Sequence, residues 1–541
     1  MAIKKIKIFN FKCFKEFTLE LNPEFNVLVG NNEAGKSTIL EAINLALTGI
    51  YRGKFIKNEL SQYLFNKEIV DTYLANLKST QKANLPAIII EIYFSNNDLA
   101  SFIGDGNSDK DRKTPGIVFS ICFDEKYEQE YGEMCKSEIQ SLPIEYYDVT
   151  WFSFAREVIT PRTIPIKASM IDSSHYRFNN GSDVYISKII KNMLTDEEIV
   201  GISQAHRLMR ESFNKKEIIS DINKKLSQST GLGDKKVTLS VDLGTKNSWE
   251  NSLVTELNDI PYTNVGKGTQ CIIKTHLALN DKNSENKKVV LIEEPECHLS
   301  HSTLNIFLKS LEYTYQGKQI IISTHSSFVA NKLGLANLLL LNNSNLVKIR
   351  ELSEETDIFF RKIAGYDTLR LLLCKKAILV EGDSDELIVQ KAYMSEHDGH
   401  LPIHDGIDVI SVGTSFLRFL ELSEKLEKEV IVITDNDGNI EALHRKYCNY
   451  IGNNQKSNIK ICYDSTEHEY TGKLKNYNYN TLEPCMLRAN DLPLLNRILG
   501  KSFEDEDSLL KYMKENKTES AIKIFDTTEP LSFPKYIMEA L

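Results

Sequence analysis

The chain has 541 residues, of which 41% are hydrophobic and 26% charged, and its formal net charge is −10. This composition is typical of a globular protein, and the length predicts about three to four domains. The acidic balance does not favour a general nucleic-acid binder, although a local basic groove is compatible with it.

The sequence also predicts where the protein resides. No apolar run approaches the roughly 20 residues that span a bilayer. Met1–Lys7 has the pattern of a charged strand rather than of a signal peptide. The nine cysteines show no CxxC pair and no metal-ligand spacing, which indicates reduced thiols. We therefore expect a cytoplasmic protein with no membrane partner.

A phosphate-binding loop is the first motif along the chain. Residues 3–21 predict two strands, and Phe25–Val29 predicts a third, apolar strand. Gly30–Thr38 then reads G-x-x-x-x-G-K-S and opens a helix that we expect to end near Gly49. The glycines let backbone N–H groups turn inward on an anion, and the helix start adds partial positive charge.

Two side chains of this loop have predicted tasks. Lys36 is expected to reach the β- and γ-phosphates of ATP, and the Ser37 hydroxyl is expected to ligate Mg²⁺. The competing interpretation is a glycine-bearing surface turn. The strand before the loop and the helix after it disfavour that interpretation, because a phosphate loop requires both.

Three strands follow the phosphate-loop helix, at Pro86–Phe94, Ile117–Phe123 and Glu145–Phe154. Together with the N-terminal strands they predict a mixed sheet beside the loop.

Residues 155–262 differ in character. Ile186–Met193 and Glu197–Leu226 have helical spacing, and Lys235–Val241 is strand-like. This stretch predicts an inserted helical subdomain. It is too short, and too weakly patterned in heptads, for a long coiled-coil arm.

A later apolar strand carries acids that match the phosphate loop. Val289–Ile292 is followed by Glu293 and Glu294. A nucleotide site needs one acid to hold the hydrated Mg²⁺, which we assign to Glu293. It also needs a base for the attacking water, which we assign to Glu294. The alternative is a strand that simply runs into a charged turn.

Two further features fit a nucleotide site. The strand Gln319–Ser323 delivers His325, which could touch the γ-phosphate, although a lone histidine is usually structural. Gly266–Gln270, which contains Lys267 and Gly268, opens an apolar helix and so forms a second anion site. One chain cannot easily direct two such sites at one γ-phosphate. This loop therefore predicts a dimer that holds ATP between two subunits.

In the last third of the chain, strands alternate with helices, which predicts a parallel sheet. Ile378–Val380 ends in Glu381, and Val430–Thr434 ends in Asp435 and Asp437. Neighbouring parallel strands present their carboxyl ends at one edge, so we expect these acids to converge around Mg²⁺ or Mn²⁺. Two such metals would activate water and stabilise the leaving oxygen of a phosphodiester. The alternative is that polar turns commonly follow strands.

The nucleotide-site motifs, in this order, resemble the ATP-binding-cassette heads of the RecF/SMC-like group. The resemblance implies that Gly30–Thr38 is Walker A, that Glu293 and Glu294 are the Walker B acid and base, and that His325 is the switch histidine. The implied nucleotide-binding residues are Asn31, Asn32, Gly35, Lys36, Ser37, Thr38, Glu293, Lys267 and Gly268. The signature loop departs from Ser-Gly-Gly-Gln by having Lys267, and the first Walker B acid is Glu rather than Asp.

The last third of the chain resembles the Toprim domain of topoisomerases, primases and OLD-family nucleases. Its OLD-type version implies two more metal ligands, Asp385 and Glu483, and a late lysine that steadies the scissile phosphate. We assign that lysine to Lys517, with Lys501 and Lys523 as competitors. The metal ligands implied for the two sites together are Ser37, Glu293, Glu381, Asp385, Asp435, Asp437 and Glu483.

An ATPase head followed by Toprim is the architecture of the OLD family of ATP-dependent endonucleases, which includes the Gabija nuclease subunit and retron effectors. The resemblance implies an α/β fold: an ABC-type head with a helical insert, then a Rossmann-like Toprim domain. The implied parts are residues 1–154 and 263–366 for the head, 155–262 for the insert and its dimer contacts, and 367–541 for Toprim and a helical tail.

The same resemblance implies a nucleotide-regulated, metal-dependent DNA endonuclease that acts in antiphage defence as a homodimer or higher homo-oligomer. The defence partners it implies are a helicase-like protein, or a retron reverse transcriptase with its RNA–DNA. One alternative is a RecF-like DNA-repair ATPase with a non-cutting Toprim. A topoisomerase would need a nucleophilic tyrosine in a separate domain, and a primase would need a zinc motif; neither is visible in the sequence.

Overall fold

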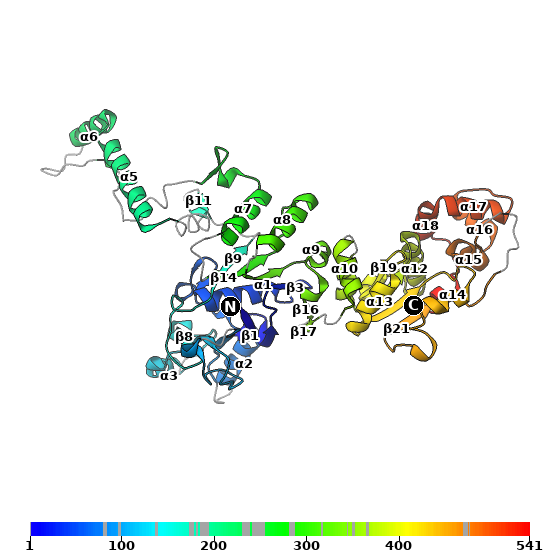
Figure 1. The fold of residues 1–541 in the computed structure, drawn as a ribbon, viewed down its shortest axis with the longest axis horizontal. Coiled ribbons are helices and arrows are strands. Elements are labelled where there is room, and N and C mark those ends of the chain that lie inside the picture. The colour runs from blue at the N-terminus through cyan, green and yellow to red at the C-terminus, as the bar shows by residue number, and fades with distance from the viewer. Residues whose placement is uncertain are drawn as a thin grey trace. The chain divides into compact units, whose positions relative to one another are not determined.

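A computed structural model gives the fold of the chain (Figure 1). The residues it describes are 2–78, 84–95, 99–135, 139–172, 178–179, 182–183, 194–229, 239–240, 255–280, 287–314, 317–342, 345–348, 352–363, 367–468, 474 and 477–541. The chain divides into two compact units. The first comprises Met1–Asn26 and Gly35–Thr324, and the second comprises Val27–Ala34 and His325–Leu541.

The first unit contains a five-stranded sheet. Its strands, in spatial order, are β2 (Phe14–Glu20), β1 (Ile3–Phe11), β6 (Ile88–Phe94), β7 (Gly116–Phe123) and β8 (Tyr147–Ser153). Every neighbouring pair is antiparallel. The predicted strand positions are confirmed, but the prediction of a mixed sheet is wrong. The pairs β1–β2, β6–β7 and β7–β8 each join strands that follow one another in the chain, an arrangement typical of antiparallel pairing.

A parallel set of strands lies in the same unit. The strand β14 (Lys287–Glu293) pairs with β15 (Gln319–Ser323) on one side and with β9 (Lys167–Asp172) on the other. β14 and β15 match the sequence prediction. β9 was not predicted, and it brings part of the 155–262 stretch into the sheet that carries Glu293.

The phosphate-loop helix α1 (Lys36–Thr48) lies between these two sets of strands. It contacts β1 and β6 of the antiparallel sheet, and β9, β14 and β15 of the parallel set. Nine of its residues are buried, which explains why both faces of this helix are apolar. The helix ends as predicted at Gly49, whose φ of 70° places it in the left-handed region.

The region predicted as a helical insert contains two described helices, α5 (Asp196–Asn214) and α6 (Glu217–Ser229). The sequence had predicted continuous helical spacing over 197–226, whereas the structure breaks the helix at residues 215–216. Thr195 and Glu198 cap the start of α5 reciprocally. The predicted helix over 186–193 lies outside the described residues. The same holds for the predicted strand over 235–241, apart from residues 239–240, which form no strand.

Other elements of the first unit frame these parts. They are α2 (Lys67–Lys78), α3 (Glu128–Met134), α7 (Lys267–Asn280), α8 (His301–Thr314), β4 (Ile50–Tyr51), β5 (Lys54–Phe55), β10 (Phe178–Asn179), β11 (Ser182–Asp183), β12 (Glu256–Leu257) and β13 (Ile260–Pro261). The helix α7 begins at Lys267, as the sequence predicts, and packs on β9 and α8.

In the second unit, β3 (Phe25–Gly30) pairs in parallel with β16 (Leu338–Asn342) through Val27–Gly30. β16 continues into the antiparallel β17 (Asn345–Lys348). A helix, α10 (Glu354–Lys362), follows β17 in the chain. The Ser353 side chain caps its start, and its Phe360 is fully buried.

The second unit also holds the predicted parallel sheet. Its strands, in spatial order, are β19 (Ile407–Ser411), β18 (Lys376–Val380), β20 (Glu429–Ile433) and β21 (Ile459–Cys462), and all pairs are parallel. The helices between them are α12 (Asp383–Glu396), α13 (Phe416–Lys425) and α14 (Ile440–Lys446). The prediction of alternating strands and helices is confirmed.

Five helices complete the C-terminal part. They are α15 (Leu482–Ala489), α16 (Leu492–Leu499), α17 (Glu506–Glu515), α18 (Lys517–Asp526) and α19 (Lys535–Met538). One hydrophobic cluster joins them to the parallel sheet through residues such as Ile378, Ile431 and Met486. Because α18 packs along α12, the C-terminal helices are anchored beside the carboxyl end of β18.

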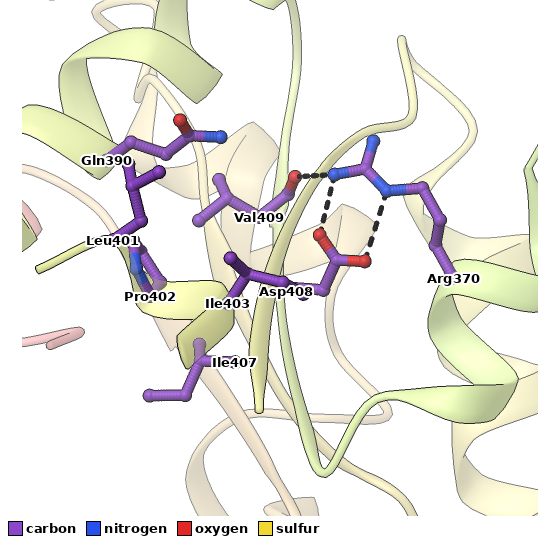
Figure 2. Close-up of a pocket in the computed structure, with 8 residues that line it drawn as sticks. All are labelled: Arg370, Gln390, Leu401, Pro402, Ile403, Ile407, Asp408 and Val409. Carbon is purple, nitrogen blue, oxygen red and sulfur yellow. Dashed lines mark hydrogen bonds and ion pairs between the residues drawn. The ribbon is translucent and has the colours of Figure 1, made fainter. Parts of the chain in front are cut away.

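An arginine fixes the edge of this sheet beside a pocket of about 320 Å³ (Figure 2). Arg370 lies in α11 (Thr368–Leu373). Its guanidinium donates to the Asp408 carboxylate at 3.1 and 2.6 Å, to the Val409 carbonyl at 2.7 Å and to Glu386 at 3.1 Å. The arginine therefore ties α11 to both β19 and α12. The residues that line the pocket are Arg370, Gln390, Leu401, Pro402, Ile403, Ile407, Asp408 and Val409, and none is a predicted site residue.

In the parts of the chain that the structure describes, no helix combines the length and the apolar character needed to cross a membrane.

Candidate nucleotide and metal sites

The phosphate loop has the backbone geometry that its glycines allow. Gly35 caps the start of α1 with φ of 96°, in the left-handed region. A Cβ built on Gly35 would lie 2.4 Å from a ring atom of Phe14. Both the left-handed backbone and this close contact therefore exclude a side chain at position 35. Lys36 and Thr38 are buried, whereas Ser37 is exposed. Asn31 and Asn32 are exposed in the loop after β3.

The predicted lysine and the predicted acids of the nucleotide site are brought together. Burial lowers the pKa of the Lys36 ammonium. Three carboxylates oppose that shift, in the order Glu294, Glu296 and Glu293. Glu293 ends β14 and Glu294 follows it, so the strand carries both predicted acids to the lysine at the start of α1.

The turn after β14 is held by a network that the sequence did not predict. Glu294 has φ of 44°, and its N–H donates to the Ser323 carbonyl of β15 at 2.9 Å. The Cys297 thiol donates to Glu294 Oε2 at 3.3 Å. Thr324 donates through Oγ1 to Glu296 Oε1 at 2.7 Å. The signal for Glu296 was available in the sequence as a third acid after the strand.

The remaining predicted nucleotide-site residues lie at the starts of helices. His325 is exposed between β15 and α9 (Ser327–Lys332). Lys267 is exposed in the first turn of α7. A Cβ on Gly268 would lie 2.5 Å from the His298 carbonyl oxygen, so this glycine permits close contact with the turn that follows Glu294. Gln270 is instead buried and donates to the carbonyls of Tyr262 and Val265.

The second predicted site lies at the carboxyl edge of the parallel sheet. Glu381 follows β18, and Asp435 and Asp437 follow its neighbour β20. Asp385 lies in the first turn of α12, and Glu483 lies in the first turn of α15. All five carboxylates predicted from the sequence therefore belong to one edge of one sheet or to the helices that begin there.

The pKa values of two of these acids show that the group shares one electrostatic environment. Burial raises the pKa of Asp435 well above its ordinary value, and further contributions come from Asp385, Glu483, Asp437 and Glu381. Burial also raises the pKa of Asp385 to about 6. The Gly382 N–H, which donates to Asp385 Oδ2 at 3.0 Å, partly opposes that second shift.

Lys517 is the candidate lysine that lies beside one of the predicted acids. Lys517, at the start of α18, lies 3.0 Å from Glu483 Oε1. Burial lowers the pKa of Lys517, but the carboxylates of Glu483, Asp385 and Asp435 outweigh that effect and raise it. The two competitors have other contacts. Lys523 pairs with Glu519, and Lys501 lies over the ring of Tyr512.

A hard divalent cation fits the chemistry of this donor set, because all five acids offer oxygen ligands and neighbouring carboxylates that repel one another favour a counter-charge. Within the described ranges, no three side chains of His, Cys, Asp or Glu gather tightly enough to hold one metal ion. Four of the carboxylates have protein donors: Asp385 accepts from Gly382, Asp435 from Leu482, Asp437 from Asn478, and Glu483 from Thr481 and Lys517.

The fold and the first site define the class of protein. The chain belongs to the AAA domain family, whose model matches residues 5–525. It therefore carries an ATPase domain, and ATP binding follows from that membership. The resemblance to OLD-family nucleases is also confirmed. The chain is 24% identical over 457 residues to the Old nuclease of Escherichia phage P2, a match that covers 74% of this chain and 71% of the phage protein.

Other similarities are confined to part of the chain or are weak. The DNA replication and repair protein RecF of Clostridium tetani is 33% identical over 75 residues, which cover 14% of this chain and 20% of that protein. Among solved structures, the SMC head domain from Thermotoga maritima covers 65% of this chain and 100% of its own, with 13% identity and a TM-score of 0.31. That score is too low to bear on the fold, which rests on the strands and helices above.

Proposed function

We propose that this protein is a nucleotide-regulated, metal-dependent DNA endonuclease of the OLD type. The observation that carries the proposal is the joining of Glu381, Asp385, Asp435 and Glu483 with Lys517 at one edge of a parallel sheet. The similarity to the Old nuclease supports it, because that match extends over 457 residues. A role in antiphage defence follows from the same resemblance.

The acids and the lysine divide the work of the proposed cleavage. Bound Mg²⁺ or Mn²⁺ would supply an activated water and neutralise charge at phosphorus. Glu381, Asp385, Asp435 and Asp437 would hold that cation, and Glu483 would hold either the cation or Lys517. Lys517 would place positive charge beside the scissile phosphate, where negative charge grows in the transition state.

In the ATPase domain, Lys36 would contact the β- and γ-phosphates, and Ser37 with Glu293 would hold the nucleotide's Mg²⁺. Glu294 would take a proton from the attacking water, and His325 would sense the γ-phosphate. The exposed Lys267, beside Gly268 at the start of α7, supports a homodimer in which this loop meets the phosphate loop of a second subunit.

The proposed domains divide the chain into a head, formed by residues 1–154 and 263–366, an insert, 155–262, and a nuclease part, 367–541. The strand β9 lies within the insert range but belongs to the sheet of the head.

The alternative is a RecF-like repair ATPase whose second site does not cut. The similarity to RecF covers only 14% of this chain, whereas the similarity to the Old nuclease covers 74%. The intact Glu381, Asp435 and Asp437 at the ends of β18 and β20 argue against this alternative. The endonuclease is therefore the function that the site supports best.

The direct test is incubation of the purified full chain with plasmid in Mg²⁺, Mn²⁺ or EDTA, each with and without ATP. We expect nicking or double-strand cleavage in metal and none in EDTA. Lys517→Ala should slow cleavage by at least about tenfold if the lysine acts on the transition state, whereas Lys501→Ala, its matched control, should cut at the wild-type rate. No cleavage by the wild type under any condition would favour the RecF-like alternative.

A further inference from the structure

The D-x-D turn after β20 contains a buried asparagine between its two aspartates. Asn436 is 2% exposed. Its Nδ2 donates to the carbonyl of Asp464 at 2.7 Å and to the carbonyl of Thr466 at 2.9 Å, and its Oδ1 accepts from the N–H of Gly438 at 2.9 Å. Both amide hydrogens and the amide oxygen are therefore used within the protein.

The turn that Asn436 braces has an unfavourable backbone. Asp437 has φ of 51° and Gly438 has φ of 73°, so two successive residues are left-handed. A left-handed aspartate is uncommon, and such a residue persists only where the surroundings determine it. The Asn436 oxygen holds the second of these residues directly, through the N–H of Gly438.

The segment after β21 closes on the same turn from the other side. Asn478 Nδ2 donates to Asp437 Oδ1 at 3.0 Å, and the Leu482 N–H donates to Asp435 Oδ2 at 3.2 Å. Each aspartate of the turn thus has one donor from residues 478–482. The Asn436 side chain also contacts the carbonyls of Asp464 and Thr466, which follow β21. One side chain thus connects the D-x-D turn after β20 with the residues after β21.

From these contacts we infer that Asn436 is a positioning residue for Asp435 and Asp437. It would hold two mutually repelling carboxylates at one place before the cation arrives, and so reduce the reorganisation that metal binding requires. Asn436 would touch neither metal nor DNA. This inference rests on the proposed function, because it assigns Asn436 a role in the same metal site.

Four variants of the full chain test the inference by calorimetric titration with Mn²⁺ in the absence of nucleotide. Asn436→Ala removes all three hydrogen bonds. Asn436→Ser keeps an acceptor near Gly438 but cannot span to residues 464 and 466, and it serves if the alanine variant does not fold. The matched control is Asn458→Ala. Asn458 Nδ2 also braces a loop, by donating to the Lys428 carbonyl at 2.9 Å, but it does so before β21, at the opposite end of the strands. Asp435→Ala, which lacks one of the proposed metal ligands, measures the Mn²⁺ binding that does not depend on this site.

We expect Asn436→Ala and Asn436→Ser to weaken the Asp435-dependent Mn²⁺ affinity by about 10- to 100-fold, and excess Mn²⁺ to restore part of the cleavage. Asn458→Ala should lower the melting temperature yet bind Mn²⁺ as the wild type does. If the Asn436 variants lose melting temperature while their Mn²⁺ affinity is unchanged, Asn436 is merely structural and the inference is wrong. If the wild type shows no Asp435-dependent binding, the proposed function fails and the inference fails with it, which is a distinct result.

Discussion

Buried acids at the edge of the parallel sheet carry a cost for the metal-free protein. Asp385 has a pKa of about 6, above its ordinary value, because burial and its neighbours disfavour the charged form. A carboxyl whose pKa is raised on folding contributes its full stability below the pKa of the unfolded chain and loses it as the pH rises through about 6. The folded chain is therefore less stable near neutral pH than a chain with an uncharged residue at position 385 would be.

Asp385→Asn should therefore stabilise the metal-free chain. The change removes the charge but keeps an oxygen that can accept from Gly382. In EDTA at pH 8 we expect a gain of about 1–3 kcal/mol, visible as a higher melting temperature by calorimetry, and the gain should shrink as the pH approaches 4. Asp383→Asn, which alters an exposed acid of the same helix, is the matched control and should have little effect. A melting temperature for Asp385→Asn at or below that of the wild type at pH 8 would contradict the electrostatic account.

The nucleotide site yields a second test at this scale. Lys36→Ala removes the buried charge that is proposed to contact the phosphates, so nucleotide binding measured by fluorescent-analogue titration should weaken by at least about tenfold. Glu294→Gln should still bind the nucleotide but hydrolyse it at least about 100-fold more slowly, because the water loses its base. Hydrolysis at the wild-type rate by Glu294→Gln would show that another group, such as Glu296, is the base.

At the scale of elements, the edge of the parallel sheet depends on one arginine. Arg370 of α11 pairs with Asp408 of β19 and Glu386 of α12. Arg370→Ala would leave the Asp408 carboxylate, which is only 13% exposed, without its cation. We expect a loss of about 1–3 kcal/mol, seen as a lower melting temperature. Arg497→Ala breaks an exposed pair with Glu529 and should change it little. Equal effects of the two variants would mean that α11 is held by other contacts.

Elements were predictable from the sequence where an apolar run ends in a motif. β3, β14, β18 and β20 each combine a short buried run with glycines or acids at the end, so strand and site were found together. β9 was missed because its parallel partner β14 lies more than a hundred residues away in the sequence, and periodicity carries no information on such pairing. The antiparallel order of the first sheet was missed because strand direction depends on the connections rather than on the residues of a strand.

Side chains that position others were also missed. Asn436 has no sequence signal beyond its place between two aspartates, since an asparagine in a turn is ordinary. Cys297 and Thr324 act through contacts with Glu294 and Glu296 that only the fold creates. The contact of Lys517 with Glu483, which supports the assignment of Lys517, is likewise visible only in the fold.

At the scale of the whole molecule, one chain combines two activities. The first belongs to the ATPase domain that family membership shows, and the second is the proposed cleavage of DNA at the acid cluster of the second unit. The two share no predicted catalytic residue. A substitution in the acid cluster should therefore silence one chemistry and leave the other in place, which few other interpretations of this chain would predict.

The central claim is tested most directly by comparing Asp435→Ala with the wild type on the same plasmid in Mn²⁺, with ATP hydrolysis measured in parallel. The account predicts that the wild type cuts, that the variant does not cut, and that both hydrolyse ATP at similar rates. Equal cutting by the wild type and Asp435→Ala would place the cleavage activity outside this acid cluster and contradict the account.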